Sequence, residues 1–240
     1  VVSIAQIVGH FILMFGVILV TAQDLGSALV YFFIFAVMLF VAGVKLYWFI
    51  MGAAALAGMI PILWTYFLED YQRNRILAPY DPSIDPTNQG INWRPTPAKH
   101  ATASGGPPGT CPGGGTQSPA NATPGEHTDF ILAVVGEELG LIGACLVILL
   151  LMIIVIRCVQ IGLRSGNTMS MLVCFGVAST VVFQTFENIG MCIGIAPVVG
   201  ITLPFFSYGG SSLFSMFAAM GLVSGIKYRP KPTRAAIYGR

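Results

Sequence analysis

Residues 130–156 read FILAVVGEELGLIGACLVILLLMIIVI, an apolar run whose only charged residues are Glu137 and Glu138. A bilayer core of about 30 Å needs roughly 20 apolar residues in a helix, so this run is long enough to cross a membrane. Backbone groups in lipid are satisfied only in helices and closed barrels, and the run lacks the period-two alternation of a barrel strand. The stretch therefore predicts a transmembrane helix.

Five further apolar runs accompany this one. They are residues 1–22, 25–44, 47–67, 168–196 and about 209–226. The chain is 55% hydrophobic and 9% charged, with a mean hydropathy of +0.78, whereas about a quarter of the residues in a soluble domain are charged. We therefore expect an all-α polytopic membrane protein with about six transmembrane helices. Val1 lies inside a hydrophobic run without an initiator methionine, so we expect the sequence to begin partway through a longer protein.

Basic residues indicate which side of the membrane each connection faces. If successive runs cross in alternate directions, eight of the 12 lysines and arginines fall on one side, which the positive-inside rule assigns to the cytoplasm. They are Lys45, Arg157, Arg164, Lys227, Arg229, Lys231, Arg234 and Arg240. This predicts three transmembrane helices in 1–67, a large extracellular loop over 68–128, three more transmembrane helices in 129–226, and a basic cytoplasmic tail over 227–240. The net charge of +2, without a basic stripe, argues against nucleic-acid binding.

The predicted extracellular loop is far longer than most connections, and loops of such length are usually functional or disordered. Its middle, residues 104–117, reads SGGPPGTCPGGGTQ and could be mistaken for a phosphate-binding loop. The Lys-Ser/Thr ending of a P-loop is missing, and no helix is predicted to follow directly. We expect a mobile loop here and no nucleotide site.

The most informative polar cluster lies where this loop re-enters the membrane. It is His127-Thr128-Asp129-Phe130, followed by Glu137. Carboxylates at or inside a membrane are costly, so they are either paired structural groups or functional ones. In one continuous helix, Asp129 and Glu137 would lie about 12 Å apart along the axis and roughly 80° apart around it, so they could line one cavity. Helix capping by Thr128 or Asp129 is the alternative, and the residues alone leave both interpretations open.

A second polar stripe lies near the outer end of the fifth predicted helix. Gln184, Glu187 and Asn188 are three and four residues apart, which puts them on one helix face. For this stripe we favour hydrogen bonding between helices over a functional role. Asp24, at the start of the second predicted helix, fits the positive N-terminal end of a helix. Four glycines fit close contacts between helices: Gly16, Gly43, Gly52 and Gly58.

Several short motifs occur in a fixed order along most of the chain. They are DLGSAL at 24–29, YQRNRI at 71–76, Asp81-Pro82, Asp85-Pro86, SGG at 104–106, GTQS at 115–118, HTDFI at 127–131, GEELG at 136–140, NIGM at 188–191 and LPFFSYGGSS at 203–212. This ordered set resembles the SEDS family, the polytopic proteins of bacterial elongation, division and sporulation exemplified by RodA, FtsW and SpoVE. The GTQS motif favours the RodA-like elongation branch over the FtsW-like division branch.

The resemblance implies a fold and a location. Family members have ten transmembrane helices with both ends in the cytoplasm, and this chain resembles helices five to ten, with the large extracellular loop between seven and eight. The topology derived from charge agrees with this. The implied location is the bacterial cytoplasmic membrane, with the C-terminus in the cytoplasm. Three loop prolines depart from the family pattern, and they put the loop geometry in question: Pro107, Pro108 and Pro112.

The same resemblance implies a peptidoglycan glycosyltransferase that polymerises lipid II at the outer membrane surface. Asp129 corresponds to the family's proposed catalytic carboxylate, and we expect a general base that partial desolvation tunes. The other expected substrate-binding residues are Arg73, Arg75, His127, Glu137 and Asp24. The first three are expected at the pyrophosphate, directly or with a divalent cation, Mg²⁺ or Mn²⁺, that bridges it to carboxylates.

The partner that the resemblance implies is a class B penicillin-binding protein, whose transpeptidase cross-links the new glycan. Two other functions stay open. Intramembrane carboxylates also mark translocation paths, so a flippase for a lipid-linked precursor is one alternative. A non-catalytic membrane scaffold that binds a penicillin-binding protein through its helices is the other. Enzyme, transporter and scaffold would all present apolar surfaces to lipid, so hydropathy does not distinguish the scaffold from the other two.

Overall fold

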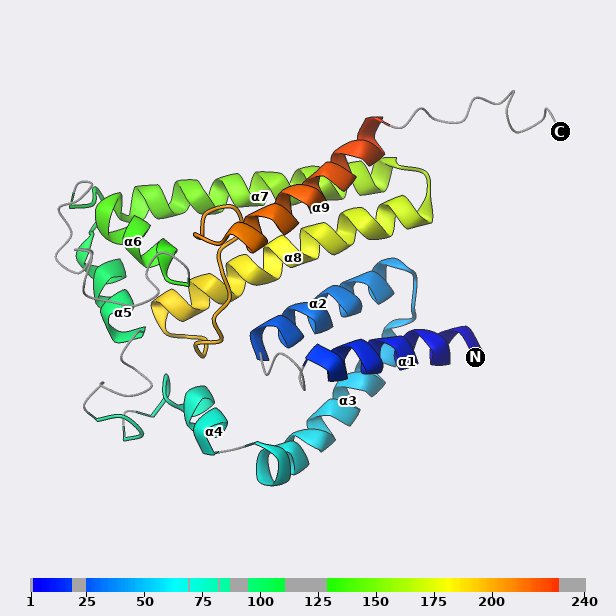
Figure 1. Cartoon of the computed structure of the whole chain (residues 1–240), viewed down its shortest axis with the longest axis horizontal. Coiled ribbons are helices and arrows are strands. Elements are labelled where there is room, and N and C mark those ends of the chain that lie inside the picture. The colour runs from blue at the N-terminus through cyan, green and yellow to red at the C-terminus, as the bar shows by residue number, and fades with distance from the viewer. Residues whose placement is uncertain are drawn as a thin grey trace.

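The computed structural model describes residues 2–18, 25–68, 70–81, 83–86, 95–110 and 129–228, which form helices, turns and loops. The helices are α1 (Val2–Val17), α2 (Leu25–Val41), α3 (Leu46–Ile62), the short π-helix η2 (Leu63–Phe67), α4 (Asp70–Leu77), α5 (Pro95–Ser104), α6 (Ile131–Glu138), α7 (Gly140–Arg164), α8 (Thr168–Ile193) and α9 (Gly210–Tyr228) (Figure 1). The all-α prediction is confirmed for this part of the chain.

Three stretches of helix are long and apolar enough to cross a membrane: Leu46–Tyr66, Gly140–Arg164 and Thr168–Ile193. Two further apolar helices, Gln6–Val17 and Gly26–Val41, are shorter. Helix α9 coincides with the sixth predicted run but is not among the three. By length and hydropathy, the described residues therefore contain three of the six predicted spans, and the other three runs are helical as well.

Helices α7 and α8 form the centre of the bundle. Figure 1 shows them side by side and antiparallel along almost their whole length. The core buries Val147 and Leu151 of α7 together with Val181 of α8. At the turn between the two helices, Asn167 caps α8, because its side chain accepts a 3.0 Å hydrogen bond from the backbone N–H of Met169.

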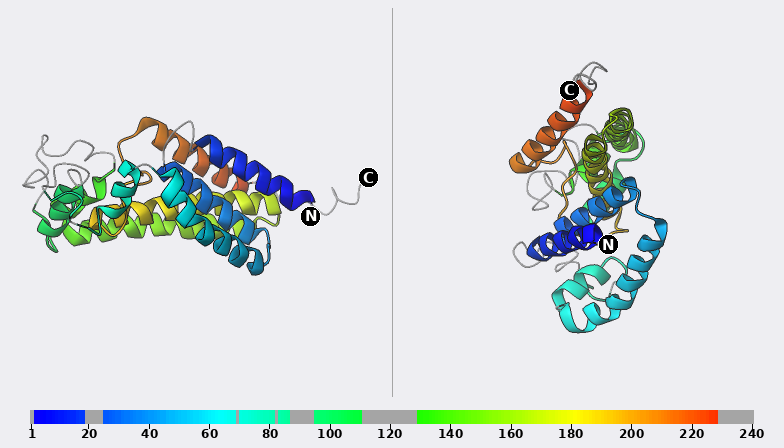
Figure 2. Two further views of the ribbon diagram at one scale, coloured as in Figure 1. Left: turned by 90° about the horizontal axis from the view of Figure 1, so that it is seen from below. Right: turned by 90° about the vertical axis from the view of Figure 1, so that its right-hand side faces the viewer.

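Helix α2 packs along α8, and α1 packs on α2. The ring centroids of Phe33 and Phe183 are 5.0 Å apart, and those of Phe11 and Phe35 are 4.1 Å apart. Seen end-on, α1 and α2 lie between the α7–α8 pair and α3 (Figure 2). No residue in the most apolar part of Leu46–Tyr66, which contains most of α3, is buried inside the protein. Its side chains face the surroundings, which suits contact with lipid tails as apolar as the side chains themselves.

The helix predicted over 130–156 is two helices. Helix α6 ends at Glu138, and α7 begins at Gly140 and continues to Arg164. Gly140 has a φ of +67°, a conformation that glycine adopts without the steric cost of a Cβ. Glu137 and Glu138 therefore lie in the short helix α6, outside the long apolar span.

The predicted extracellular loop contains two helices, α4 and α5. Its described segment 104–110, which we expected to be mobile, is hydrogen-bonded to α6 and α7. The carbonyl of Gly106 accepts a 3.0 Å bond from the N–H of Leu141, and the carbonyl of Glu137 accepts one of 3.0 Å from the N–H of Thr110. Residues 111–117 lie outside the described residues. The segment that the structure does describe is thus held in place.

The glycine contacts also differ from the prediction. Among the described atoms, nothing lies within 4 Å of the position that a Cβ would take at Gly16, Gly43, Gly52 or Gly58. The prediction of close helix contacts there is wrong for the part of the chain described. The closest backbone approaches occur instead between segment 104–110 and α6, where loop meets helix.

Candidate functional site

Asp129, the candidate catalytic carboxylate, lies in the turn that precedes α6. Its backbone carbonyl accepts a 2.7 Å hydrogen bond from Nδ2 of Asn188. The same nitrogen donates a second bond, of 2.9 Å, to the carbonyl of Ile201. Asn188 is 0% exposed, whereas Asp129 is half-buried. Helix α8 therefore holds the chain at Asp129 through one buried amide.

The segment 194–209, between α8 and α9, lies against the side chain of Asp129. Gly200 has a φ of +75°, and a Cβ built there would lie 3.7 Å from Oδ2 of Asp129. Glycine adopts this conformation without strain, so the backbone can run beside the carboxylate. Further along, Oγ of Ser207 accepts a 2.7 Å hydrogen bond from the N–H of Leu203, which closes a turn in the predicted LPFFSYGGSS motif.

Glu137 lies in α6 and is 0% exposed. Asp129 is not part of that helix, so the spacing calculated for one continuous helix does not apply. The N-cap of α6 is Phe130, without a side-chain hydrogen bond. Asp129 is therefore not the N-cap residue of α6, and Thr128, the other predicted cap, lies outside the described residues.

Segment 104–110 supports α6 through close backbone contacts. A Cβ at Gly105 would overlap the carbonyl oxygen of Gly136, and a Cβ at Gly109 would overlap that of Glu138. Backbones approach this closely only where a residue has no Cβ. Because α6 directly follows the Asp129 turn, these contacts also restrict where that turn can lie.

Arg73 does not lie at the α6 turn. In α4, its guanidinium donates to Oδ1 of Asp70 at 3.3 Å and to the carbonyl of Thr65 at 3.1 Å. Figure 1 shows α4 well apart from α6. The description does not extend to three other candidates: the side chain of Arg75, and the residues His127 and Asp24. Of the predicted site, the structure thus places Asp129 and Glu137 at the α6 end of the bundle.

Two contacts at the end of α8 have no sequence signal. The Cε and Nζ atoms of Lys99, in α5, lie against Gly194, which ends α8 in a left-handed conformation. A cation is favourable there because the C-terminal end of a helix carries partial negative charge. The hydroxyl of Tyr80 donates a hydrogen bond to the carbonyl of Ile195. Lys99 and Tyr80 both lie in the predicted extracellular loop, and the sequence could not reveal either contact because each joins segments far apart in the chain.

The polar side chains on this face of α8 differ in their hydrogen bonding. Asn188 bonds to a turn and a loop, so the prediction of bonds between helices is wrong for it. Oε1 of Gln184 and Oγ1 of Thr185 are buried without a hydrogen-bond partner among the described residues. Glu187 is 7% exposed. Leaving a buried polar group without a partner costs about 1–3 kcal/mol. The two hydrogen bonds of Asn188 avoid this cost, so Asn188 is the member of the stripe whose burial the geometry explains.

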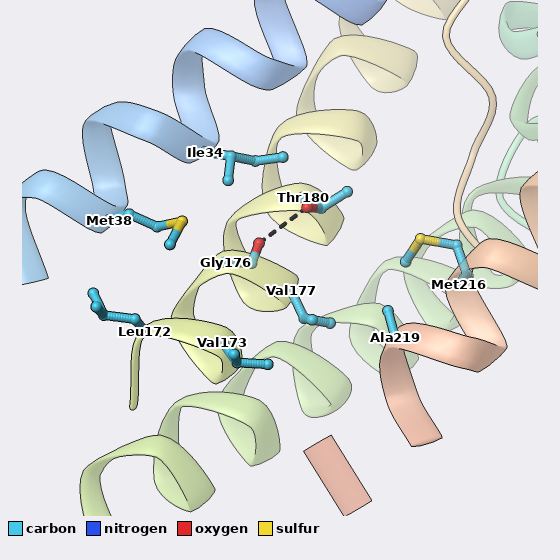
Figure 3. A pocket seen from close by; sticks show the side chains of 9 residues that line it. All are labelled: Ile34, Met38, Leu172, Val173, Gly176, Val177, Thr180, Met216 and Ala219. Carbon is cyan, nitrogen blue, oxygen red and sulfur yellow. Dashed lines mark hydrogen bonds between the residues drawn. The ribbon is translucent and has the colours of Figure 1, made fainter. Parts of the chain in front are cut away.

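An apolar pocket of about 220 Å³ lies between α2, α8 and α9 (Figure 3). Ile34 and Met38 line it from α2, and Met216 lines it from α9. On α8 it reaches only to Thr180, about 12 Å along the helix from Asn188. None of the residues that line this pocket is an acid or a base, so it cannot supply acid–base chemistry.

Within the described ranges, no three His, Cys, Asp or Glu side chains gather closely enough to hold a metal ion. Two of the predicted ligands of substrate or cation, His127 and Asp24, lie outside those ranges. The divalent cation therefore stays a prediction.

Known proteins are similar to this chain in sequence and in fold. Residues 2–231 match the FtsW/RodA/SpoVE family, described as cell cycle proteins. The peptidoglycan glycosyltransferase MrdB of Escherichia coli K12 is 39% identical over 212 residues, which are 87% of this chain and 56% of MrdB. This chain thus spans little more than half the length of that relative.

Two solved structures resemble this one. One is a chain from a structure described as the coordination of polymerisation and crosslinking by a peptidoglycan synthase complex, with 33% identity and a TM-score of 0.76 over 94% of this chain and 62% of that one. The other is an aspartate-to-alanine mutant of the rod-shape-determining protein RodA of Thermus thermophilus, with 26% identity and a TM-score of 0.61 over 94% of this chain and 58% of that one. Together with the apolar helices, these similarities show a multi-pass membrane protein.

Proposed function

The chain belongs to the FtsW/RodA/SpoVE family of cell cycle proteins, and from this membership we propose that it polymerises lipid II into peptidoglycan glycan strands. The placement of Asp129 carries the proposal. It is a half-buried carboxylate in a turn, held by a buried amide and flanked by a glycine that has no side chain to cover it. A general base needs this combination of fixed position and access to substrate.

In the proposed reaction, the 4-hydroxyl of one sugar attacks the anomeric carbon of a second sugar that is linked to lipid pyrophosphate. Asp129 takes the proton of the attacking hydroxyl as the new C–O bond forms. The bond between the anomeric carbon and the pyrophosphate oxygen breaks, and the lipid pyrophosphate leaves with that electron pair. General bases of this kind contribute about 10²–10⁴-fold to rate.

We further propose that α1, α2, α3, α7, α8 and α9 are six membrane spans, corresponding to helices five to ten of the family. The α5–α6 end of the bundle would then face outward, where lipid II is polymerised. The positive-inside rule supports this orientation, because Arg157, Arg164 and Lys227 lie at or near the ends of α7 and α9 remote from α6.

A class B penicillin-binding protein is the proposed partner. The similar chain from a peptidoglycan synthase complex supports this, since that assembly combines polymerisation with crosslinking. Co-purification of the complete gene product with such a protein in gentle detergent tests the proposal. Elution of the two proteins as separate species would count against it.

The test of the proposed reaction is Asp129→Asn in the complete gene product, purified and supplied with lipid II. We expect glycan strands on a gel to fall by at least about 100-fold, because an amide cannot accept the proton. Asp70→Asn is the matched control, because it removes an exposed carboxylate whose ion pair with Arg73 contributes little to stability. Polymerisation by Asp129→Asn at the wild-type rate would show that the assignment is wrong.

A fluorescent lipid II assay in vesicles separates polymerisation from transport. If Asp129→Asn stops movement of lipid II between leaflets while strand synthesis continues, the protein is a flippase. If strand synthesis alone is lost, Asp129 acts in polymerisation.

A further inference from the structure

Asn188 is a fully buried polar side chain beside Asp129, and its carboxamide joins two separate segments. We propose that Asn188 is a positioning residue that sets the distance between the Asp129 carboxylate and the backbone at Gly200. The inference rests on the proposed function, since it concerns how that function's base is held. Asn188 itself does not touch substrate in this proposal.

The first step is the chemistry of the amide. An Asn side chain has two N–H donors on one nitrogen. The two bonds from Nδ2 of Asn188 go to the carbonyl of Asp129 at 2.7 Å and to that of Ile201 at 2.9 Å. Both donors are thereby used, and each of the two carbonyls gains a partner inside the protein. No other neutral side chain of this size presents two donors from one atom.

The second step is what the two carbonyls control. One belongs to Asp129, so fixing it limits rotation of the backbone that carries the carboxylate. The other belongs to Ile201, which directly follows Gly200, the residue whose missing Cβ would lie 3.7 Å from Oδ2 of Asp129. A single nitrogen thus links Asp129, which bears the carboxylate, to the backbone at Gly200–Ile201 beside it.

The third step is that this link is rigid. Asn188 is 0% exposed, and Oδ1 on its other side lies 4.0 Å from Sγ of Cys192, one turn further along α8. Bulk water therefore does not compete for either bond while the side chain is in place. Displacing a catalytic group by about 1 Å can lower a rate about 100-fold, so loss of this link should appear in turnover before it appears in substrate binding.

The test is a series of variants with a falling number of donors: Asn188 with two, Asn188→Ser with one, and Asn188→Leu with none. The complete gene product is assayed with lipid II, and kcat and KM are determined per folded protein. We expect kcat to fall in that order, by about 10- to 100-fold for leucine, while KM stays within about twofold. Serine supplies the answer if the leucine variant does not fold.

Val181→Ala is the matched control, because Val181 is fully buried on the same helix, α8, two turns or about 10 Å along the axis from Asn188. If Asn188 were merely structural, its variants and Val181→Ala would lose folded protein and keep kcat per folded molecule. Unchanged kcat in the serine and leucine variants, or an equal rise in KM, overturns the inference. If wild type fails to polymerise, or Asp129→Asn remains active, the proposed function itself fails, which distinguishes the two outcomes.

Discussion

Gly105→Ala tests the contact that holds segment 104–110 on α6. The new Cβ would overlap the carbonyl oxygen of Gly136 and lie 2.9 Å from both Cα and the carbonyl oxygen of Glu137. All of these are backbone atoms, so no side chain can rotate to make room, and α5 must move away from α6. Forcing an extra carbon into a packed contact costs about 1–3 kcal/mol.

The expected cost converts into a temperature. For proteins of about 150–250 residues, 1 kcal/mol corresponds to a Tm shift of roughly 2–4 °C, so Gly105→Ala should unfold about 2–12 °C below wild type. Gly136→Ala is the control on the other side of the same contact. Its Cβ would lie 3.6 Å from Cα of Thr102, an ordinary contact, and alanine in a helix is favoured over glycine by about 0.5–1 kcal/mol.

The assay is thermal unfolding of the detergent-purified protein, followed by intrinsic fluorescence, with lipid II polymerisation measured on the same samples. Gly105→Ala should lose stability and activity together, because α6 and the Asp129 turn move. Gly136→Ala should equal or exceed wild type in stability. A Tm for Gly105→Ala as high as that of Gly136→Ala would refute the close approach of the two backbones.

Lys99→Met should lower the free energy of unfolding by about 0.3–1 kcal/mol at low salt and by less at high salt, because the end of α8 at Gly194 loses a cation. Thermal unfolding at two salt concentrations measures this, and a loss that does not depend on salt would contradict it. Hydrogen bonds from Oγ and N of Ser83 hold the pKa of Asp81 below its ordinary value. The stabilisation of this turn is therefore present above the unfolded-state pKa and is lost as pH falls through the lower folded-state pKa. Ser83→Ala should raise that pKa, and an NMR titration of labelled aspartate that shows no change would exclude the assignment.

The helices were predictable because their cause is local. The apolar side chains of runs such as 25–44 and 168–196 have to face lipid or the protein core, away from water. In lipid, the backbone N–H and C=O groups of such a run must also bond to each other. Apart from a closed barrel, only a helix meets both requirements. The boundary at Gly140 was not predictable, since nothing in GEELGLIG shows which glycine takes a positive φ. That choice depends on segment 104–110, which packs against the break.

The candidate site divides in the same way. The position of Asp129 between loop and helix, and its membership of an ordered motif set, could be read from the residues alone. The partners of Asp129 could not, because Asn188 and Gly200 are remote in the chain and meet it only when α8 and segment 194–209 fold beside the turn.

By itself, then, the sequence determined that this is a helical membrane protein of the FtsW/RodA/SpoVE type and which carboxylate is the candidate base. The helical membrane class follows from hydropathy, whereas the family and the candidate base follow from the resemblance of an ordered set of short motifs. Only the tertiary structure decided that α6 is separate from α7, that Arg73 pairs with Asp70 and Thr65, and that one buried amide holds Asp129. Each of these depends on hydrogen bonds and steric contacts whose partners the linear order does not specify.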